Sequence, residues 1–500
     1  MNSSTHGGTE HWDRWIERIL LLSIVAVFVV RAISLFTTPI IDSYRWWGDE
    51  SWLMTEFMTQ MREGVFRHPY AFGASIQHSS GSLLGSMWLT ALVYGGATSL
   101  FQSIQPEIVH IGRIVSFACS GVVLLMTFRL LRNVGVSSTL SLVSVALLCS
   151  STAFFYMGHS ARYDMLTALA ILGLIIILSS IVKQAGTWRS TFLIGALLVG
   201  GATISVHVLL LSALPVVAFL IRSGAMRRPK NVIGFIAGCL AAGSLLVGAQ
   251  AIVGNVSVFG SSQTTTFVNN VREIPAMRPF SRSVQVANVV QKIKTMMELA
   301  PVLFISTIAL SIVLAIGTYM KQRGRTMQPA FTWLTLLSLL VILSWVIFES
   351  AAPTSYVIYV LPFACIICGI GLESLLTWGR RSIPGLRAVL GCLGIMLLIQ
   401  STFRDHAEAQ IGEKLSTANE QVISEALAAI NVDRSIRHDT ISRIVAFNPA
   451  IHRLLATPGV NPMTTHFVEF PASAASLPGR PPCWSTTAGE QAGCRRTRFR

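Results

Sequence analysis

Long runs of apolar residues dominate the sequence and constrain its fold more than any other feature. A helix that crosses a bilayer needs roughly 20 consecutive apolar residues, and most of the runs approach or reach that length. Only 12% of the residues are charged, whereas soluble proteins carry about 25%. The sequence therefore predicts an all-α integral membrane protein. The runs lie near residues 19–36, 83–103, 108–128, 136–156, 164–182, 191–205, 207–221, 232–254, 300–319, 330–348, 356–376 and 386–401.

The basic residues fall mostly between these runs and predict the orientation of the chain. A net charge of +15 would suggest nucleic acid in a soluble protein, but no stretch interleaves Lys and Arg with aromatic residues. We therefore expect no nucleic-acid partner. Short loops rich in Lys and Arg favour the cytoplasmic side of a membrane. The clusters are Arg129 with Arg132, Lys183 with Arg189, Arg222 to Lys230, Lys321 to Arg325, and Arg380 to Arg387.

Twelve full spans do not fit this orientation rule. With a cytoplasmic N-terminus at residues 1–18, a spanning helix at 83–103 would place Arg129 and Arg132 outside the cell. We therefore expect 83–103 to lie on the outer leaflet or dip into it, with Trp88 and Tyr94 at the interface. About 11 transmembrane helices then remain in a multi-pass protein of the cell (inner or plasma) membrane, with an extracytoplasmic C-terminus.

Three domains follow from this arrangement. They are a cytoplasmic N-terminus at 1–18, a transmembrane catalytic domain at 19–401, and a small extracytoplasmic C-terminal domain or tail at 402–500. The first outer loop of the catalytic domain covers 37–107 and is expected to carry surface helices.

The cysteines fall into two groups. Those in apolar runs are expected to be buried structural thiols, because free Cys packs as a small hydrophobe. Cys483 and Cys494 lie together in the polar tail, where a disulfide and two free thiols both remain open. The first group is Cys119, Cys149, Cys239, Cys365, Cys368 and Cys392.

An acidic pair, Asp49-Glu50, lies in the first outer loop directly before a helix predicted at 51–62. Carboxylates placed where an apolar span meets water are costly unless they have a function. Both could instead cap the helix, because a helix N-terminus favours negative charge. We treat both as candidate catalytic residues.

Other polar residues are expected on the same outer face. Arg162 and Asp164 lie where one span emerges and the next enters. They would contact a sugar or acceptor, or serve as an interfacial anchor and an N-cap. His78 and His207 would contact a phosphate or ligate a metal as neutral imidazoles, or pack as hydrogen-bonded side chains.

Two tyrosines and a basic segment complete the candidate site. Tyr356 and Tyr359 are three residues apart and share one helix face, although interfacial tyrosines also form membrane belts. The outer segment 255–298 carries positive charge that suits a lipid phosphate. Its basic residues are Arg272, Arg278, Arg282, Lys292 and Lys294.

The order of these features resembles the polytopic GT-C glycosyltransferases, in particular the branch of aminoarabinose transferases and bacterial relatives of protein O-mannosyltransferases. The resemblance covers about residues 15–375. It is carried by the outer loop with Asp49-Glu50, the surface helices, Ile111-Gly112-Arg113, Arg129-Leu-Leu-Arg132, Gly158-His-Ser-Ala-Arg-Tyr-Asp164 and Tyr356-x-x-Tyr-x-x-Pro362.

The resemblance implies a GT-C bundle that uses a polyprenyl-phosphate-sugar donor on the extracytoplasmic face. Asp49 matches the catalytic acidic residue of the family's first outer loop, with Glu50 as its neighbour. Asp164 matches the acidic residue of the second outer turn. His207 lies where some relatives place a metal-binding or substrate-contacting histidine, so a divalent metal is a candidate cofactor.

The family's aromatic segment near the carrier phosphate matches Tyr356 and Tyr359, but the chain also departs from the family pattern. Ser355 replaces the Arg that often precedes that segment. Ser51-Trp52-Leu53 stands in place of an Arg-Tyr pair, and His78-Ser79-Ser80 in place of a basic residue or His followed by two prolines. These differences concern the sugar and the phosphate contacts, and they leave the base assignment standing.

The predicted activity is transfer of a monosaccharide from a polyprenyl-phosphate carrier to an extracytoplasmic lipid, glycan or protein acceptor. The carboxylate of Asp49 would deprotonate the acceptor hydroxyl as general base, and direct displacement would invert the anomeric centre. Hydrogen-bond donors or cations would stabilise the leaving phosphate. The alternatives are a polytopic transporter or flippase, and a glycan polymerase or ligase that uses lipid-linked substrates.

Overall fold

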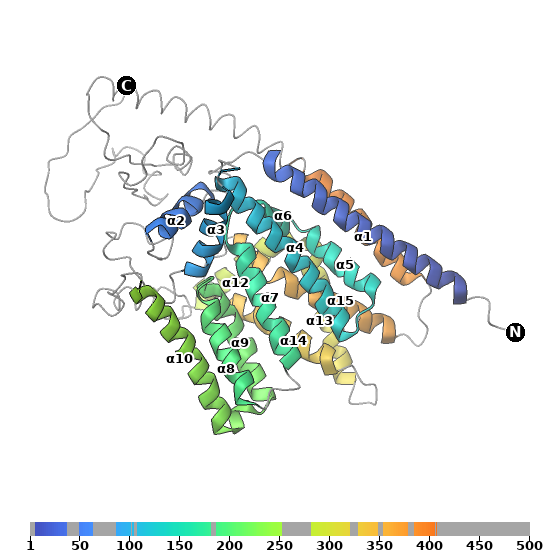
Figure 1. The fold of residues 1–500 in the computed structure, drawn as a ribbon. Coiled ribbons are helices and arrows are strands. Elements are labelled where there is room, and N and C mark those ends of the chain that lie inside the picture. The colour runs from blue at the N-terminus through green and yellow to red at the C-terminus, as the bar shows by residue number, and fades with distance from the viewer. Residues whose placement is uncertain are drawn as a thin grey trace, which may run out of the picture.

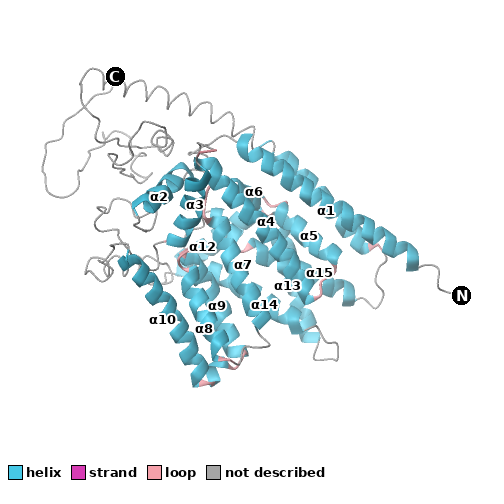
Figure 2. Cartoon of the chain, in the orientation of Figure 1, coloured by secondary structure: helices cyan, strands magenta, loops and turns pink. Residues whose placement is uncertain are grey.

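The computed structural model describes residues 6–37, 50–63, 87–101, 103–104, 108–181, 187–252, 282–320, 329–348, 354–378, 385–405 and 407. All regular elements within these ranges are helical (Figure 2), which confirms the all-α prediction. The elements up to residue 252 are α1 (His6–Thr37), α2 (Glu50–Glu63), α3 (Trp88–Phe101), α4 (Ile108–Val134), α5 (Ser138–Cys149), α6 (Thr152–His159), α7 (Asp164–Ile181), α8 (Trp188–Gly201), α9 (Val206–Arg222), η1 (Ala225–Arg227) and α10 (Pro229–Ile252). Those that follow are α12 (Arg282–Leu299), α13 (Pro301–Met320), α14 (Pro329–Phe348), η5 (Thr354–Tyr359), α15 (Leu361–Trp378) and a last helix (Leu386–Asp405).

The protein crosses the membrane several times. Within the described residues, four helices are long and apolar enough to span, and up to six spans result if two bent helix pairs are each counted as one. The four are Arg14–Phe36 of α1, α4, Pro329–Ile347 of α14 and the last helix. Five shorter apolar helices accompany them. The expected total of about 11 spans remains a prediction.

One apolar run does not form a single helix. The sequence suggested one continuous helix over 136–156, whereas the structure ends α5 at Cys149 and starts α6 at Thr152, with a bend of 68°. Two serines explain the break, because serine side chains compete with the helical hydrogen bonds. The Ser151 hydroxyl accepts a hydrogen bond from the Phe154 amide at 3.2 Å and thereby caps α6.

The segment 37–107, predicted as the first outer loop, contains two described helices, α2 and α3, where the sequence predicts helices. They form a small apolar cluster apart from the main core, in which Phe57 of α2 packs against Tyr94 of α3. Gly95 allows close approach, because a Cβ there would lie 2.8 Å from the carbonyl oxygen of Phe57. Figure 1 shows α2 and α3 together at one end of the bundle, near α6. The depth of α3 in the membrane stays a prediction.

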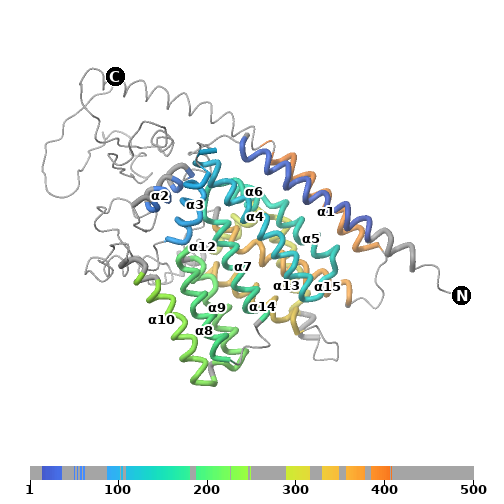
Figure 3. Tube along the Cα trace, viewed as in Figure 1, coloured from blue at the N-terminus to red at the C-terminus, as the bar shows by residue number. Residues whose placement is uncertain are grey.

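The last helix lies alongside α1, although the two are at opposite ends of the described chain (Figures 1 and 3). A Cβ at Gly391 would overlap Ile16, and one at Gly394 would touch Leu20. Small residues permit such close packing of membrane helices. The described part of the last helix covers Leu386–Asp405 and includes residue 401, where the sequence predicts a domain boundary.

Candidate functional site

Glu50 connects three segments at one end of the bundle. Its carboxylate accepts hydrogen bonds from Arg113 Nε at 3.0 Å and Nη2 at 2.7 Å, a two-pronged ion pair between α2 and α4. It also accepts a hydrogen bond from the Ala161 amide at 2.6 Å, in the turn between α6 and α7. Both side chains are fully buried. Such a paired, hydrogen-bonded charge is stable where an isolated one is not.

The turn contacted by Glu50 continues into a second buried ion pair. Arg162 Nε donates to Asp164 Oδ2 at 2.8 Å, and the Tyr359 hydroxyl donates to Asp164 Oδ1 at 2.6 Å. Asp164 is the first residue of α7 and is fully buried. The positive end of the helix dipole stabilises its negative charge. The carboxylate therefore has a donor on each oxygen.

An aromatic group surrounds this carboxylate on the side of η5. Residues three apart in a 3₁₀-helix lie on the same edge, and the rings of Tyr356 and Tyr359 stack with centroids 5.4 Å apart. The His207 ring lies 4.6 Å from Tyr356 and 5.2 Å from Tyr359, measured between centroids. His207 Nδ1 is 2.9 Å from the hydroxyl of Ser205, which caps α9.

Tyr359 is a hydrogen-bond donor at all ordinary pH values. Burial, and then the negative charge of Asp164, raise the pKa of the Tyr359 hydroxyl well above its usual 10.0. The residue lies in η5, outside the candidate membrane spans. A protonated phenol that faces a carboxylate fixes the orientation of both groups.

Two further side chains hold the turn from α3 and α4. The carbonyl oxygen of Arg162 accepts hydrogen bonds from the Tyr94 hydroxyl at 2.7 Å and the Ser116 hydroxyl at 3.0 Å. Together with Glu50, they fix the backbone of residues 160–163 against α2, α3 and α4. The turn is therefore a rigid part of the site.

The structure brings most of the expected site residues together and adds others. Glu50, Arg162, Asp164, His207, Tyr356 and Tyr359 form one connected neighbourhood. Asp49 and His78 lie outside the described residues.

Sequence reasoning did not select Arg113, Tyr94 or Ser116 as site residues. Arg113 had a usable signal, because it is a charge inside the apolar run 108–128. Tyr94 and Ser116 had none, since their role depends on the fold of the turn.

The described residues do not fit a metal site. No group of three or more His, Cys, Asp and Glu side chains within them has a suitable arrangement. Both oxygens of Asp164 are already engaged by Arg162 and Tyr359, and Nδ1 of His207 contacts Ser205. No chemical step is therefore assigned to a metal ion.

An apolar groove of about 320 Å³ begins beside this neighbourhood. Helices α12, α13 and α14 and the start of α15 line it, and Val360, one residue after Tyr359, is part of its wall. Lys292 reaches its edge and donates to the carbonyl oxygens of Trp345 at 3.0 Å and Val346 at 2.8 Å. The remaining wall is mostly aliphatic, so the groove suits a hydrocarbon chain.

No protein-family model matches the sequence, and no curated protein matches it. Among solved structures, one match is the archaeal oligosaccharyltransferase AglB from Archaeoglobus fulgidus in complex with an inhibitory peptide and a dolichol-phosphate. The similarity covers 90% of this chain. The match covers 65% of that protein, with 10% sequence identity and a TM-score of 0.47. The apo crystal structure of the Archaeoglobus fulgidus oligosaccharyltransferase matches 79% of this chain and 56% of its own, with 10% identity and a TM-score of 0.42.

This chain thus spans 56–65% of the length of those two proteins. Both of those proteins are oligosaccharyltransferases, and the likeness is one of overall arrangement at a low TM-score. At 10% identity the chemistry of the site rests on this chain's own residues.

Proposed function

We propose that this protein is a membrane glycosyltransferase that moves a monosaccharide from a polyprenyl-phosphate carrier to an extracytoplasmic lipid, glycan or protein acceptor. One observation carries the proposal: the Glu50 carboxylate binds the amide of Ala161, next to the Arg162–Asp164–Tyr359 group. This bond joins the start of α2 to the turn between α6 and α7, two segments that the sequence predicts on the same outer face.

Asp49 is proposed as the general base. It directly precedes Glu50 in the sequence. Glu50 is engaged through both oxygens by Arg113 and Ala161, so we assign it a positioning role. It would hold the backbone of the outer loop against the turn and leave Asp49 as the carboxylate available for proton transfer.

In the proposed reaction, the acceptor oxygen bonds to the anomeric carbon on the face opposite the phosphate, and its proton passes to Asp49. The bond between the anomeric carbon and the phosphate oxygen breaks, and polyprenyl phosphate leaves with the electron pair. The configuration of the sugar inverts. A carboxylate in this role raises rates typically 10²–10⁴-fold.

The leaving phosphate needs groups that stabilise its charge. Tyr356, whose ring stacks on that of Tyr359, and His207, whose ring is tilted against both, are proposed to contact it. Arg162 is a cation of the same neighbourhood. The groove that begins at Val360 supports a lipid donor, because its aliphatic wall suits an isoprenoid chain. Asp164, whose carboxylate is oriented by Arg162 and Tyr359, would contact the sugar or the acceptor.

The first test is donor turnover by the purified protein in lipid nanodiscs. A panel of polyprenyl-phosphate sugars is offered with a crude envelope acceptor, and wild type is compared with Asp49→Asn. Release of polyprenyl phosphate by wild type and at least a 100-fold loss in the folded variant supports both the class and the base. Turnover that survives in Asp49→Asn moves the base to Glu50 or Asp164.

A second arm separates the alternatives. If wild type releases no polyprenyl phosphate from any donor, the glycosyltransferase proposal is rejected for that panel. Movement of an intact labelled lipid between the leaflets would then identify a flippase, and growth of a glycan chain from diphosphate-linked lipid would identify a polymerase or ligase. Asp164→Asn is measured in the same assay, and a loss smaller than that of Asp49→Asn supports Asp49 over Asp164 as the base.

A further inference from the structure

A buried ion pair joins the first and last described helices. Arg31 of α1 donates from Nε at 3.1 Å and Nη2 at 2.6 Å to Asp405 Oδ2, across 374 positions of sequence. The two side chains are 5% and 9% exposed. Charges buried in this way carry a desolvation cost that only good geometry and further hydrogen bonds offset. The proposed transfer chemistry uses neither residue.

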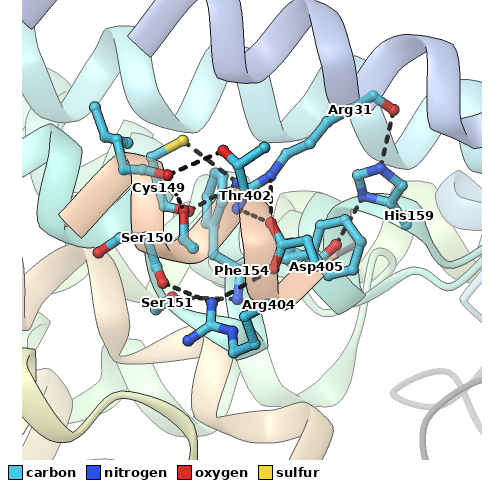
Figure 4. Close-up of polar contacts among 12 residues, drawn as sticks. Arg31, Cys149, Ser150, Ser151, Phe154, His159, Thr402, Arg404 and Asp405 are labelled. Carbon is cyan, nitrogen blue, oxygen red and sulfur yellow. Dashed lines mark hydrogen bonds and ion pairs between the residues drawn. The ribbon is translucent and has the colours of Figure 1, made fainter. Parts of the chain in front are cut away.

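The further hydrogen bonds go to the break between α5 and α6. The last carbonyl groups of a helix have no hydrogen-bond donor within that helix. Here two of these carbonyl groups accept hydrogen bonds from arginine side chains. Arg31 Nη1 donates to the carbonyl oxygen of Cys149 at 2.7 Å, and Arg404 Nη2 to that of Ser150 at 2.8 Å. Figure 4 shows both guanidinium groups directed at this break, with Asp405 between them.

A histidine at the C-terminal end of α6 also contacts α1. His159 Nε2 lies 2.9 Å from the carbonyl oxygen of Arg31 and 2.9 Å from the hydroxyl of Ser34. The Arg31 guanidinium lies 5.1 Å from the ring centre of Phe155, which packs 4.2 Å from the His159 ring. The two turns of α6 are thus held at both ends by α1 and the last helix.

The segment held in this way leads directly into the candidate site. His159 is followed by residues 160–163, whose Ala161 amide binds Glu50 and whose Arg162 pairs with Asp164. The adjoining end of α1 lies at the start of α4, because the rings of Phe36 and His110 are 6.0 Å apart. The Arg31–Asp405 pair is therefore at the same end of the bundle as the site.

We infer that Asp405 and Arg31 are positioning residues for the site: the last helix, through this pair, fixes α6 and hence the turn 160–163. A short helix of eight residues after a 68° bend has few hydrogen bonds of its own to set its direction. The two arginines replace the backbone bonds that the break removes. The placement of the turn does not depend on the proposed function, although the kinetic readout below does.

The decisive experiment is hydrogen–deuterium exchange on the full-length protein in nanodiscs, for wild type and Asp405→Asn. We expect exchange in peptides covering 151–164 to become about 10-fold faster, with peptides of α8 to α10 unchanged. Equal exchange in 151–164, or faster exchange over the whole chain, overturns the inference. Arg404→Met removes the bond to Ser150 and a 3.5 Å contact to Asp405 but keeps the Arg31–Asp405 pair. It gives a milder second variant with a smaller rise in the same peptides.

Arg387→Met is the matched control at the other end of the last helix. Arg387 pairs with Glu373 of α15 at 3.2 Å, so its loss also removes an ion pair of this helix. We expect exchange in 151–164 to remain at the wild-type rate, and a rise equal to that of Asp405→Asn overturns the inference.

A kinetic measurement accompanies the exchange experiment. In donor turnover, Asp405→Asn should lower kcat about 10-fold and leave KM for the donor within about 2-fold, because the groove at α12 to α15 is untouched. A lower kcat with equally raised KM would contradict a positioning role. If wild type shows no turnover, the proposed function fails and the exchange result still decides the inference.

Discussion

The hydroxyl of Tyr359 lies 2.6 Å from Oδ1 of Asp164, across 195 positions of sequence. This bond joins η5, which leads into α15, to the first residue of α7. Arg162 occupies the other oxygen of the same carboxylate. The direction of the Asp164 carboxylate is therefore set by one neutral and one cationic donor.

Tyr359→Phe tests whether this bond serves catalysis. The ring stack with Tyr356 and His207 remains, and only the donor to Asp164 is lost. Leaving a buried acceptor with one donor fewer costs about 1–3 kcal/mol, so we expect kcat/KM to fall about 10- to 100-fold in donor turnover. A folded Tyr359→Phe variant that keeps the wild-type kcat/KM would show that the bond does not serve catalysis.

The raised pKa of Tyr359 predicts loss of stability in alkali. In the unfolded chain the phenol loses its proton near pH 10.0, while burial and Asp164 keep it protonated in the fold. Its contribution is thus fully present below pH 10 and declines as the pH rises further, by up to about 1.4 kcal/mol per pH unit. In detergent between pH 9 and 11, the Tm of Tyr359→Phe should fall less steeply with pH than the Tm of wild type. Parallel profiles for the two proteins would contradict the assigned shift.

The Glu50–Arg113 pair should show strong non-additivity. Arg113→Met leaves a buried carboxylate without its counter-charge, which costs about 3–5 kcal/mol. The double variant Arg113→Met with Glu50→Leu removes both charges and should be more stable than Arg113→Met alone, measured by chemical unfolding in detergent. We expect it to remain inactive, because the loop that carries Asp49 loses its contact to Ala161. An active double variant would refute the positioning role of Glu50.

A bulky substitution in the groove should raise the KM for donors with a long lipid chain and leave the KM for short-chain donors unchanged. Ile308 lines the groove and is 48% exposed; Ile308→Trp adds bulk where an isoprenoid chain would lie. We expect KM for a long-chain donor to rise about 10-fold and KM for a short-chain, water-soluble analogue to stay unchanged. Leu240→Trp on α10, an exposed apolar position away from the groove, is the control. An identical rise for both donors would argue against the groove as the carrier site.

Much of the fold could be predicted from the sequence, because the spacing of apolar runs reflects the length of membrane helices. Each described run contains a helix, and the run 136–156 contains two, α5 and α6. The helix predicted at 51–62 is also present as α2. The break at Ser150-Ser151 was not predicted. Hydropathy alone does not distinguish a straight helix from a bent one when both are equally apolar.

The sequence predicted part of the candidate site. Acidic and aromatic residues near span ends, such as Asp164 and Tyr359, are conspicuous in an apolar sequence. Their partners are harder to find, because Arg113 and Tyr94 act only once α3, α4 and the turn are packed together. The role of Asp405 could not be predicted, because nothing in the sequence shows that the last helix packs against α1, which carries its partner Arg31.

The separation of Arg31 and Asp405 also has a consequence for biogenesis. The ribosome adds roughly 5–20 residues per second, so 374 residues take on the order of tens of seconds. Throughout that time the Arg31 side chain lacks Asp405, and its insertion costs at most about 2.5–3.5 kcal/mol, the value for an arginine at a helix centre. Its apolar flanks must outweigh that cost until translation reaches the last helix. The nascent chain therefore completes its site late, and a ribosome that stalls before residue 405 releases a protein whose first helix still lacks its carboxylate partner.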